Sequence, residues 1–368
     1  VGSEMCIRDR LTGIGVAFPI CTVTIAFANL VGMGGAPLFS IERGKGNEDE
    51  AKKLLGNSFS LLIILGLLTG VTGLIFKKPL LYLLGASSAT FDYANQYITI
   101  YLCGTIFVML SLGLNSFINA QGFARTGMLT VSIGAACNLI LDPVFIFILG
   151  MGVKGAALAT VLAQGISGLC CLWYIGKHFP ILRGTKEEWK PLPKYMMRLC
   201  AVGIPMGMQY SITAIGTLVI QAAVNGFGST VVAGVTAANK LGNFVSCPIE
   251  ALGQTMAPYV GQNMGAGKPK RIGKGLLAAS LMGFGVSAVL LVIVLLFGKP
   301  MTLLFLSAKE VKAVKYAYQY MIVTTAGYSL LTLVNTVRFT IQGMGYSAIA
   351  ILAGVFEMAA RTLAGTLV

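Results

Sequence analysis

The sequence predicts an all-α membrane protein made of two pseudo-symmetric six-helix bundles, with about ten of the twelve transmembrane helices present in this chain. Three observations lead to this expectation. Of the 368 residues, 56% are hydrophobic and 11% are charged, which is too apolar for a water-soluble fold. The apolar residues form charge-poor runs that reach the roughly 20 residues a helix needs to cross hydrocarbon. Short motifs of the first half also return about 221 residues later.

Ten apolar runs are long enough to be transmembrane helices. We interpret all of them as helices, because a helix satisfies its own backbone hydrogen bonds in lipid and the runs are too long for barrel strands. The predicted spans are 11–40, 54–76, 93–120, 126–150, 155–176, 199–224, 232–262, 275–298, 316–341 and 345–368.

The basic residues between these runs predict the orientation. Alternate breaks, around 41–53, 122–127, 177–198 and 263–274, hold 15 Lys and Arg residues, whereas those around 77–92, 151–154, 225–231 and 299–315 hold 7. Positive residues accumulate on the cytoplasmic side of a membrane protein. The first set of breaks is therefore predicted to face the cytoplasm.

An internal repeat underlies this pattern. The matching pairs are Ala36-Pro37 with Ala257-Pro258, Gly44-Lys45-Gly46 with Gly265-Ala266-Gly267 and Gln121-Gly122 with Gln342-Gly343 at an offset of 221, and Gln96-Tyr97 with Gln319-Tyr320 at 223. Both Gly-x-Gly breaks belong to the predicted cytoplasmic set, so the two copies run in the same sense. The sequence therefore predicts a duplicated protein with two lobes.

The duplication also predicts the domain organisation. The helices at 199–224 and 155–176 would have their counterparts before residue 1 and after residue 368, so we expect a fragment that holds helices two to eleven of twelve. The predicted parts are an N-lobe at 11–176, a cytoplasmic linker at 177–198 and a C-lobe at 199–368. Residues 1–10 carry four charges directly before an apolar run and resemble a non-native leader.

Asp142 is the acid that hydrophobicity does not explain. It is the only charged residue between 126 and 150, and a carboxylate at the bilayer centre costs roughly 2.5–3.5 kcal/mol on insertion scales. Pro143 follows it directly and removes a backbone hydrogen bond, which predicts a kink. That kink has two readings, a part in the working cycle or simple packing.

Composition and motifs argue against several classes of protein. The net charge of +14 lies in short breaks rather than along one groove, which points to lipid headgroups and not to nucleic acid. The eight cysteines form no CxxC pair, and His178 is the single histidine, so we expect neither disulfides nor a multi-histidine metal centre. The basic segment 265–271 lacks the glycine spacing and the Ser/Thr of a phosphate loop.

The sequence resembles the multidrug and toxic compound extrusion (MATE) family over essentially all of residues 11–368. The segments that carry the resemblance are GMGGAPLFSIERGKGN at 32–47, NSFINAQG at 115–122, NLILDP at 138–143, GAALATVLAQ at 155–164, VGIPMGMQ at 202–209 and VGQNMGAG at 260–267. The resemblance implies a secondary antiporter that exports small organic, often cationic, compounds in exchange for H⁺ or Na⁺.

The resemblance also implies a cation site in the N-lobe. The family's Asn, Asp and Thr are matched by Asn138, Asp142 and Thr160, with Tyr97 as a further member. Positions i and i+4 share one helix face, so the amide and the carboxylate can converge on one ion. The family's second acid lies on a first helix that this chain does not contain. No metal is expected beyond Na⁺ at Asp142, Asn138 and Thr160, and no cofactor.

Desolvation gives the site its predicted mechanism. An isolated carboxylate in a low-dielectric lobe favours its protonated form, so Asp142 is expected to load and release a proton near physiological pH. As a hypothesis, that change and drug binding favour opposite-facing states, and rocking of the two lobes exchanges one ligand for the other. We expect a monomer in the lipid bilayer of the inner (plasma) membrane.

The C-lobe carries further polar residues inside its predicted spans. Glu250 is expected either to form a second cation or substrate site or to pair with an unseen partner such as Arg338. Glu357 and Arg361, at i and i+4, are expected to neutralise each other, and Arg338 and Lys240 to snorkel to the interface. The series containing Gln209 and Thr213 is predicted either to line a cavity or to bind helices together.

Two other functions remain open at this stage. A lipid-linked oligosaccharide flippase of the same superfamily would share the two-bundle plan, but it would be expected to carry a cationic cavity instead of lone acids. A membrane-embedded enzyme would need a catalytic set, and the sequence has no His/Asp or Ser/His constellation. We therefore expect a transporter and not an enzyme.

Overall fold

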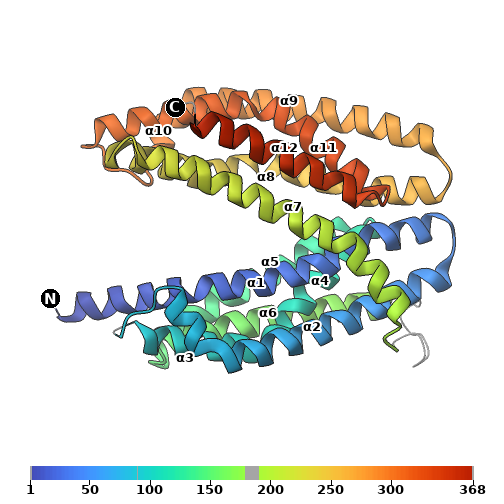
Figure 1. Ribbon diagram of the computed structural model, residues 1–368, viewed down its shortest axis with the longest axis horizontal. Coiled ribbons are helices and arrows are strands. Elements are labelled where there is room, and N and C mark those ends of the chain that lie inside the picture. The colour runs from blue at the N-terminus through green and yellow to red at the C-terminus, as the bar shows by residue number, and fades with distance from the viewer. Residues whose placement is uncertain (1, 89, 179–189, 367–368) are drawn as a thin grey trace. The chain divides into compact units, whose positions relative to one another are not determined.

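The computed structural model describes residues 2–88, 90–178 and 190–366. These residues are almost entirely helical and contain no β-strand (Figure 1). The first helices are α1 (Gly2–Gly44), α2 (Glu48–Leu83), α3 (Phe91–Cys103), α4 (Thr105–Ala120), α5 (Ala124–Pro143), the π-helical turn η1 (Val144–Ile148) and α6 (Val153–His178). The remaining ones are α7 (Pro193–Asn225), α8 (Ser229–Gly265), α9 (Pro269–Thr302), α10 (Val311–Ala326), α11 (Tyr328–Gly343) and α12 (Ser347–Thr366).

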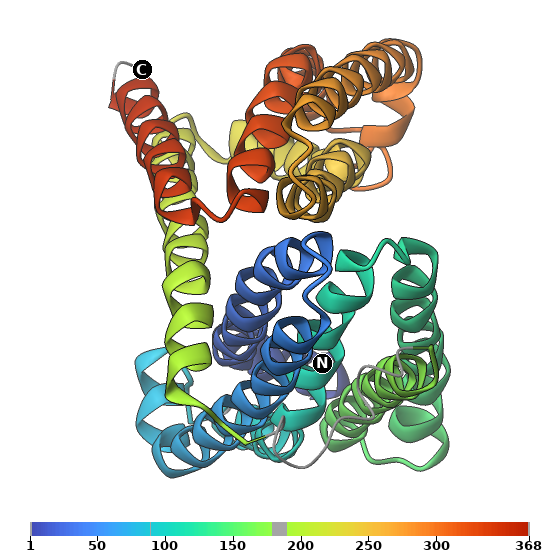
Figure 2. The same ribbon diagram turned by 90° about the vertical axis from the view of Figure 1, so that its right-hand side faces the viewer.

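The chain forms two compact units, each a bundle of long helices that run side by side (Figure 2). The N-terminal unit consists of Val1–Arg43 and Asn47–Ile204, and the C-terminal unit consists of Gly44–Gly46 and Pro205–Val368. The helices α1 to α6 belong to the N-terminal unit, except for Gly44, the last residue of α1, which belongs to the C-terminal unit. The helices α8 to α12 belong to the C-terminal unit. Helix α7 begins in the first unit and continues into the second.

Most of the predicted spans are present as long apolar helices. Within the described residues, seven single helices are long and apolar enough to cross a membrane, and two bent pairs raise the number to nine. The exception is the predicted span 232–262, which forms α8 and is not among these nine. The reason is that α8 carries polar residues such as Lys240, Glu250 and Gln254 along its length.

Two predicted spans consist of two helices each, where the sequence predicts one. The span 93–120 is α3 and α4, bent by 57° at Gly104, and the span 316–341 is α10 and α11, bent by 47° at Gly327. The two glycines are 223 residues apart in the sequence. Each unit therefore contains the same bent helix at the same place in the repeat.

The turns after the bent helices correct the register of the repeat. Gly122 and Gly345 have positive φ of 89° and 88°, a conformation that suits glycine, and they too are 223 residues apart. The sequence match of Gln121-Gly122 with Gln342-Gly343 at 221 is therefore wrong by two residues. Gly46 and Gly267, with φ of 73° and 64°, keep the offset of 221. The second copy therefore has two more residues between Gly267 and Gly345 than the first copy has between Gly46 and Gly122.

The predicted span 126–150 consists of α5 and the π-helical turn η1. Pro143 is the last residue of α5, and the helix widens directly after it. In this turn the Leu149 N–H donates to the Val144 carbonyl at 2.9 Å. The helix is therefore irregular at the residues that follow Asp142.

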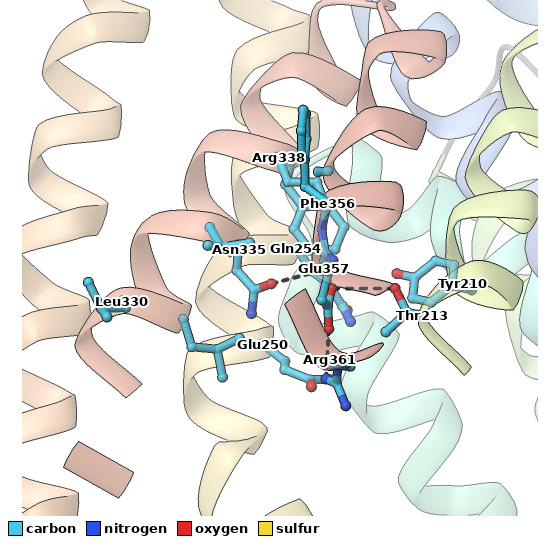
Figure 3. Close-up of a pocket in the computed structure, with 14 residues that line it drawn as sticks. Tyr210, Thr213, Glu250, Gln254, Leu330, Asn335, Arg338, Phe356, Glu357 and Arg361 are labelled. Atoms are coloured by element: carbon cyan, nitrogen blue, oxygen red, sulfur yellow. Dashed lines mark hydrogen bonds and ion pairs between the residues drawn. The ribbon is translucent and has the colours of Figure 1, made fainter. Parts of the chain in front are cut away.

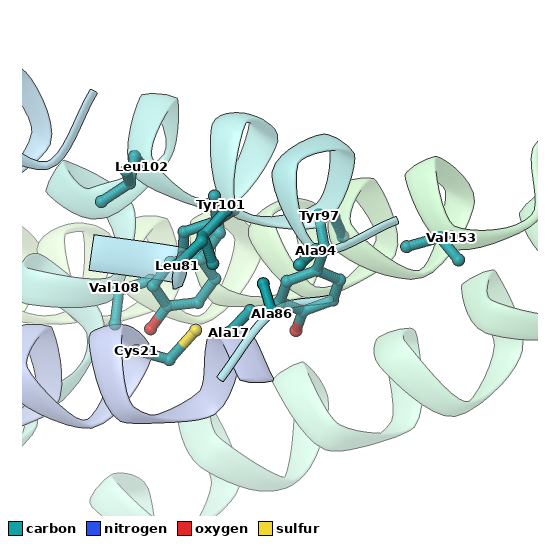
Figure 4. Close-up of a cluster of buried hydrophobic side chains, with 12 residues drawn as sticks. Ala17, Cys21, Leu81, Ala86, Ala94, Tyr97, Tyr101, Leu102, Val108 and Val153 are labelled. Carbon is teal, nitrogen blue, oxygen red and sulfur yellow. The ribbon is translucent and has the colours of Figure 1, made fainter. Parts of the chain in front are cut away.

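The core of the N-terminal unit is a cluster of buried apolar side chains around Tyr97 and Tyr101 of α3 (Figure 4). Ala17 and Cys21 of α1, Val108 of α4 and Val153 of α6 complete it from the neighbouring helices. This cluster anchors the helix that carries Tyr97 against the rest of the unit.

The start of α7 is attached to the N-terminal unit by polar contacts. The Arg198 guanidinium lies 3.2 Å from the Glu42 carboxylate, and the Tyr195 hydroxyl donates to Glu50 at 2.8 Å. The Leu192 N–H donates to the Asn57 side chain at 2.7 Å. Of the segment 177–198 that the sequence assigns to the linker, residues 179–189 lie outside the described residues.

Candidate functional site

Asp142 and Asn138 lie one turn apart on α5, where both side chains are half-buried. The Asp142 Oδ1 and Asn138 Nδ2 atoms are buried, and neither has a hydrogen-bond partner in the described residues. Buried polar groups are normally satisfied, so each exception needs an explanation. An acceptor and a donor are thus left free on the same face of one helix.

Thr160 and Tyr97 approach this pair from two other helices. The Thr160 side chain of α6 lies beside the Tyr97 phenol oxygen of α3, and the Asp142 carboxylate lies within electrostatic range of the same phenol. Thr160 also donates to the Ala156 carbonyl at 2.9 Å, which orients its hydroxyl. Thr160 and Asp142 therefore both lie near the Tyr97 phenol, and Asn138 lies one turn before Asp142 on the same helix.

Tyr97 is the most buried member of the set, with 7% of its surface exposed. Its ring stacks on that of Tyr101, with centroids 6.3 Å apart and planes inclined by 13° (Figure 4). The stacked neighbour holds the ring, so the phenol oxygen has little freedom to move. Carboxylate, hydroxyl and amide oxygens are the ligands that hard cations prefer.

The C-terminal unit contains a cavity of about 760 Å³ between α7, α8, α11 and α12 (Figure 3). Four charged side chains line it, Glu250, Arg338, Glu357 and Arg361. The other lining residues are Tyr210, Thr213, Gln254, Leu330, Leu331, Val334, Asn335, Phe339, Ala353 and Phe356. Polar and charged groups therefore face an otherwise apolar and aromatic wall.

Two of these charges neutralise each other, as the sequence predicts. The Arg361 guanidinium lies 2.7 Å from the Glu357 carboxylate, one turn earlier on α12 (Figure 3). Helix α7 supports both, because Thr213 donates to Glu357 at 3.4 Å and Arg361 donates to Thr217 at 3.1 Å. This pair connects α12 to α7 at one side of the cavity.

Arg338 lines the cavity, and its snorkelling to the membrane interface stays a prediction. Its guanidinium donates to the Asn335 side chain at 2.7 Å and lies over the Phe339 ring, 5.1 Å from the centroid. Asn335 is three residues away on the same helix, so the spacing contained a signal that we did not use. No ion pair within 4.0 Å joins Arg338 or Glu250 to an opposite charge in the described chain.

The two helix-seven residues that we singled out lie in different surroundings. Thr213 lines the cavity, whereas Gln209 is 1% exposed and is not among the lining residues. The Gln342 side-chain amide of α11 donates to the Gln209 side-chain oxygen at 2.9 Å. Gln209 thus binds α7 to α11, which is the second of the two roles considered.

The fold and the two sites define a class of protein, a polytopic membrane transporter with polar groups enclosed in each of two helical bundles. The sequence profile of the MatE family matches residues 8–144 and 205–364, and the chain belongs to that family. It is similar to the probable multidrug resistance protein YpnP of Bacillus subtilis, with 29% identity over 84% of this chain and 69% of that protein.

Two further comparisons agree with the family assignment. The chain is 29% identical to the multidrug export protein MepA of Staphylococcus haemolyticus, and the match covers 71% of this chain and 58% of that protein. The fold is similar to that of the Vibrio cholerae MATE transporter VcmN in its bent form, with a TM-score of 0.85, 19% identity and coverage of 96% and 85%.

Proposed function

We propose that this protein exports small organic compounds, often cationic ones, in exchange for H⁺ or Na⁺. The family assignment supports a transporter, and the similarity to the multidrug resistance protein YpnP and the multidrug export protein MepA supports multidrug efflux. One observation carries the coupling proposal: Asp142 Oδ1 and Asn138 Nδ2 are buried without a hydrogen-bond partner in the described residues. Such groups are costly in lipid unless they serve a ligand.

Asp142, Asn138, Thr160 and Tyr97 form the proposed cation site. Protonation of Asp142, or binding of Na⁺ to the carboxylate and the neighbouring oxygens, would remove the uncompensated charge from the N-terminal unit. The loaded and empty sites would then stabilise different states of the transporter, and the substrate would favour the opposite state. The ion and the substrate would thus exchange by alternating exposure of the two lobes.

The proposal includes an arrangement in the membrane. The N-lobe at 11–176 and the C-lobe at 199–368 would cross the plasma membrane several times, joined by a cytoplasmic linker at 177–198. The lipid bilayer would be the only permanent partner of a monomer that has no cofactor and no enzymatic activity. The seven apolar helices and two bent pairs support the multiple crossings.

The alternative, a lipid-linked oligosaccharide flippase, has less support. A pyrophosphate would need a surplus of positive charge, whereas two arginines and two glutamates line the cavity of the C-terminal unit. An antiporter accounts for the lone acid at Asp142, which a flippase does not require.

Asp142→Asn tests the proposed coupling, since it keeps the shape of the side chain and removes its charge. We expect dye efflux from ethidium-loaded cells to fall to the level of cells without the protein, while the amount of protein in the membrane is unchanged. In proteoliposomes, an imposed pH or Na⁺ gradient should drive ethidium transport by the unmodified protein and not by the variant.

Asp92→Asn is the matched control, because Asp92 is an exposed acid in the first turn of α3. It should retain efflux. Normal efflux by Asp142→Asn would contradict the proposed role, and the gradient that drives transport would identify the coupling ion.

A further inference from the structure

The cavity of the C-terminal unit contains two charges that no ion pair compensates. Glu357 is neutralised by Arg361 at 2.7 Å. Arg338 has only the neutral side-chain oxygen of Asn335 at 2.7 Å and the face of Phe339, and its buried Nε has no hydrogen-bond partner. Glu250 faces the same cavity from α8, with no cation within 4.0 Å in the described residues (Figure 3).

The repeat shows that this cavity is not a second copy of the proposed cation site. At the offset of 223, the position of Asn138 on α5 corresponds to Arg361 on α12. A guanidinium therefore stands where the N-terminal unit has an amide. At the same offset Asp142 corresponds to Gly365, so the coupling carboxylate has no counterpart on α12.

The half-buried guanidinium of Arg338, which has no anionic partner in the described residues, suits a carboxylate or phosphate group, because its fork of N–H donors matches two oxygens. An uncompensated carboxylate across the same cavity favours a cationic group. The wall between them contains Phe339, Phe356 and Val334, which suits the apolar body of an organic molecule. The volume of about 760 Å³ is that of a typical small-molecule site.

We propose that this cavity binds organic zwitterions, with the anionic group of the ligand at Arg338 and its cationic group at Glu250. The assignment deepens the proposed export function, since it names a substrate class and the residues that select it. The anionic group displaces no existing ion pair, because the hydrogen bond of Arg338 in the described residues goes to the neutral side chain of Asn335. Asn335 positions the guanidinium and keeps it turned along α11.

Rhodamine B and its ethyl ester are a matched pair of probes for this proposal. Both carry the same cationic xanthylium ring, and only rhodamine B has a free carboxylate. We expect Arg338→Gln to weaken binding of rhodamine B to the purified full chain in detergent by roughly tenfold or more, the loss of one charge-assisted bond. Binding of the ester should change by less than about twofold, since it lacks the anion.

Three further variants keep the test decisive. Arg338→Lys should restore part of the rhodamine B affinity, since it keeps the charge without the fork. Glu250→Gln should weaken both dyes, because both carry the cation. Lys240→Gln removes a positive charge from the same helix as Glu250 but outside the cavity lining, so it should change neither.

The proposal fails if rhodamine B does not bind, or if Arg338→Gln affects both dyes equally or neither. Fluorescence polarisation measures this binding without a membrane gradient, so the result is independent of transport. If Arg338→Gln weakened binding of rhodamine B alone but the protein exported no dye from cells, the assignment of the cavity would hold. The proposed export function would then be refuted.

Discussion

At the scale of the residue, buried polar groups divide into those that satisfy each other and those that do not. The Gln342 side-chain nitrogen and the Gln209 side-chain oxygen, which bond to each other, are of the first kind, and Asp142 Oδ1 and Asn138 Nδ2 are of the second. The sequence predicted Asp142 because an acid in an apolar run has no other reason to be there. It did not distinguish the two possible roles of Gln209, because that depends on which face of α7 meets α11.

The Gln209–Gln342 pair predicts a double-mutant cycle. Gln209→Leu would remove the side-chain oxygen that accepts from the Gln342 amide, whose own oxygen has no partner in the described residues, so the entire buried amide would be unsatisfied. We expect a loss of roughly 1–3 kcal/mol of stability, seen as a lower unfolding temperature in detergent. Gln209→Leu combined with Gln342→Leu should recover most of the lost stability, since two apolar side chains then replace both members of the hydrogen bond and no amide is left buried there.

Ser211→Ala, on an exposed part of the same helix, serves as the control and should leave the unfolding temperature unchanged. If the double variant were as unstable as the sum of the two single ones, the hydrogen bond between the amides would not be what stabilises this contact.

At the scale of the element, the bent helices are the feature that the sequence hid. Hydropathy reports only that 93–120 is apolar, and a glycine within such a run is as compatible with a straight helix as with a bend. The contact that requires Gly104 comes from a helix distant in the sequence. A side-chain carbon at Gly104 would overlap the Val161 side chain of α6.

Gly104→Ala should therefore weaken the packing of the bent pair on α6. We expect a destabilisation of roughly 1–3 kcal/mol, the usual effect of overpacking. Val161→Ala in the same chain should relieve the overlap and restore part of the unfolding temperature. Gly15→Ala is the matched control in α1, because nothing lies within 4 Å of a side-chain carbon there. Equal unfolding temperatures for Gly104→Ala and Gly15→Ala would count against this packing.

At the scale of the whole molecule, the sequence contained both the duplication and the number of long helices. The predicted offset of 221 between the copies was inaccurate. The second copy has two more residues between its turn at Gly267 and its bend at Gly327 than the first copy has between Gly46 and Gly104. A search for identical residues can pair residues that do not occupy equivalent backbone positions. The bends and turns mark the equivalent positions directly. The sequence indicated Glu250 and Thr213 as candidates for a site in the C-terminal unit, but it did not indicate that Arg338 joins them, because four helices contribute to the cavity.

The charge asymmetry predicts which turns face the cell interior. In a variant without its native cysteines, a cysteine at Lys309 should react with a membrane-impermeant maleimide added to intact cells. A cysteine at Lys268, at the turn before α9, should react only after the cells are opened. Labelling in the reverse order would mean that the orientation is inverted, and a variant that retains efflux ensures that the labelled protein is folded.

The π-helical turn Val144–Ile148 changes the phase of the helix that carries Asp142. Each residue of an α-helix advances the side chain by about 100°, so one residue accommodated in a wider turn rotates everything beyond it by that amount. Residues 144–148 therefore do not continue the helical wheel of α5, and the helix ends at Ile148. The face that carries Asn138 and Asp142 thus reaches the end of the regular α-helix at the acid.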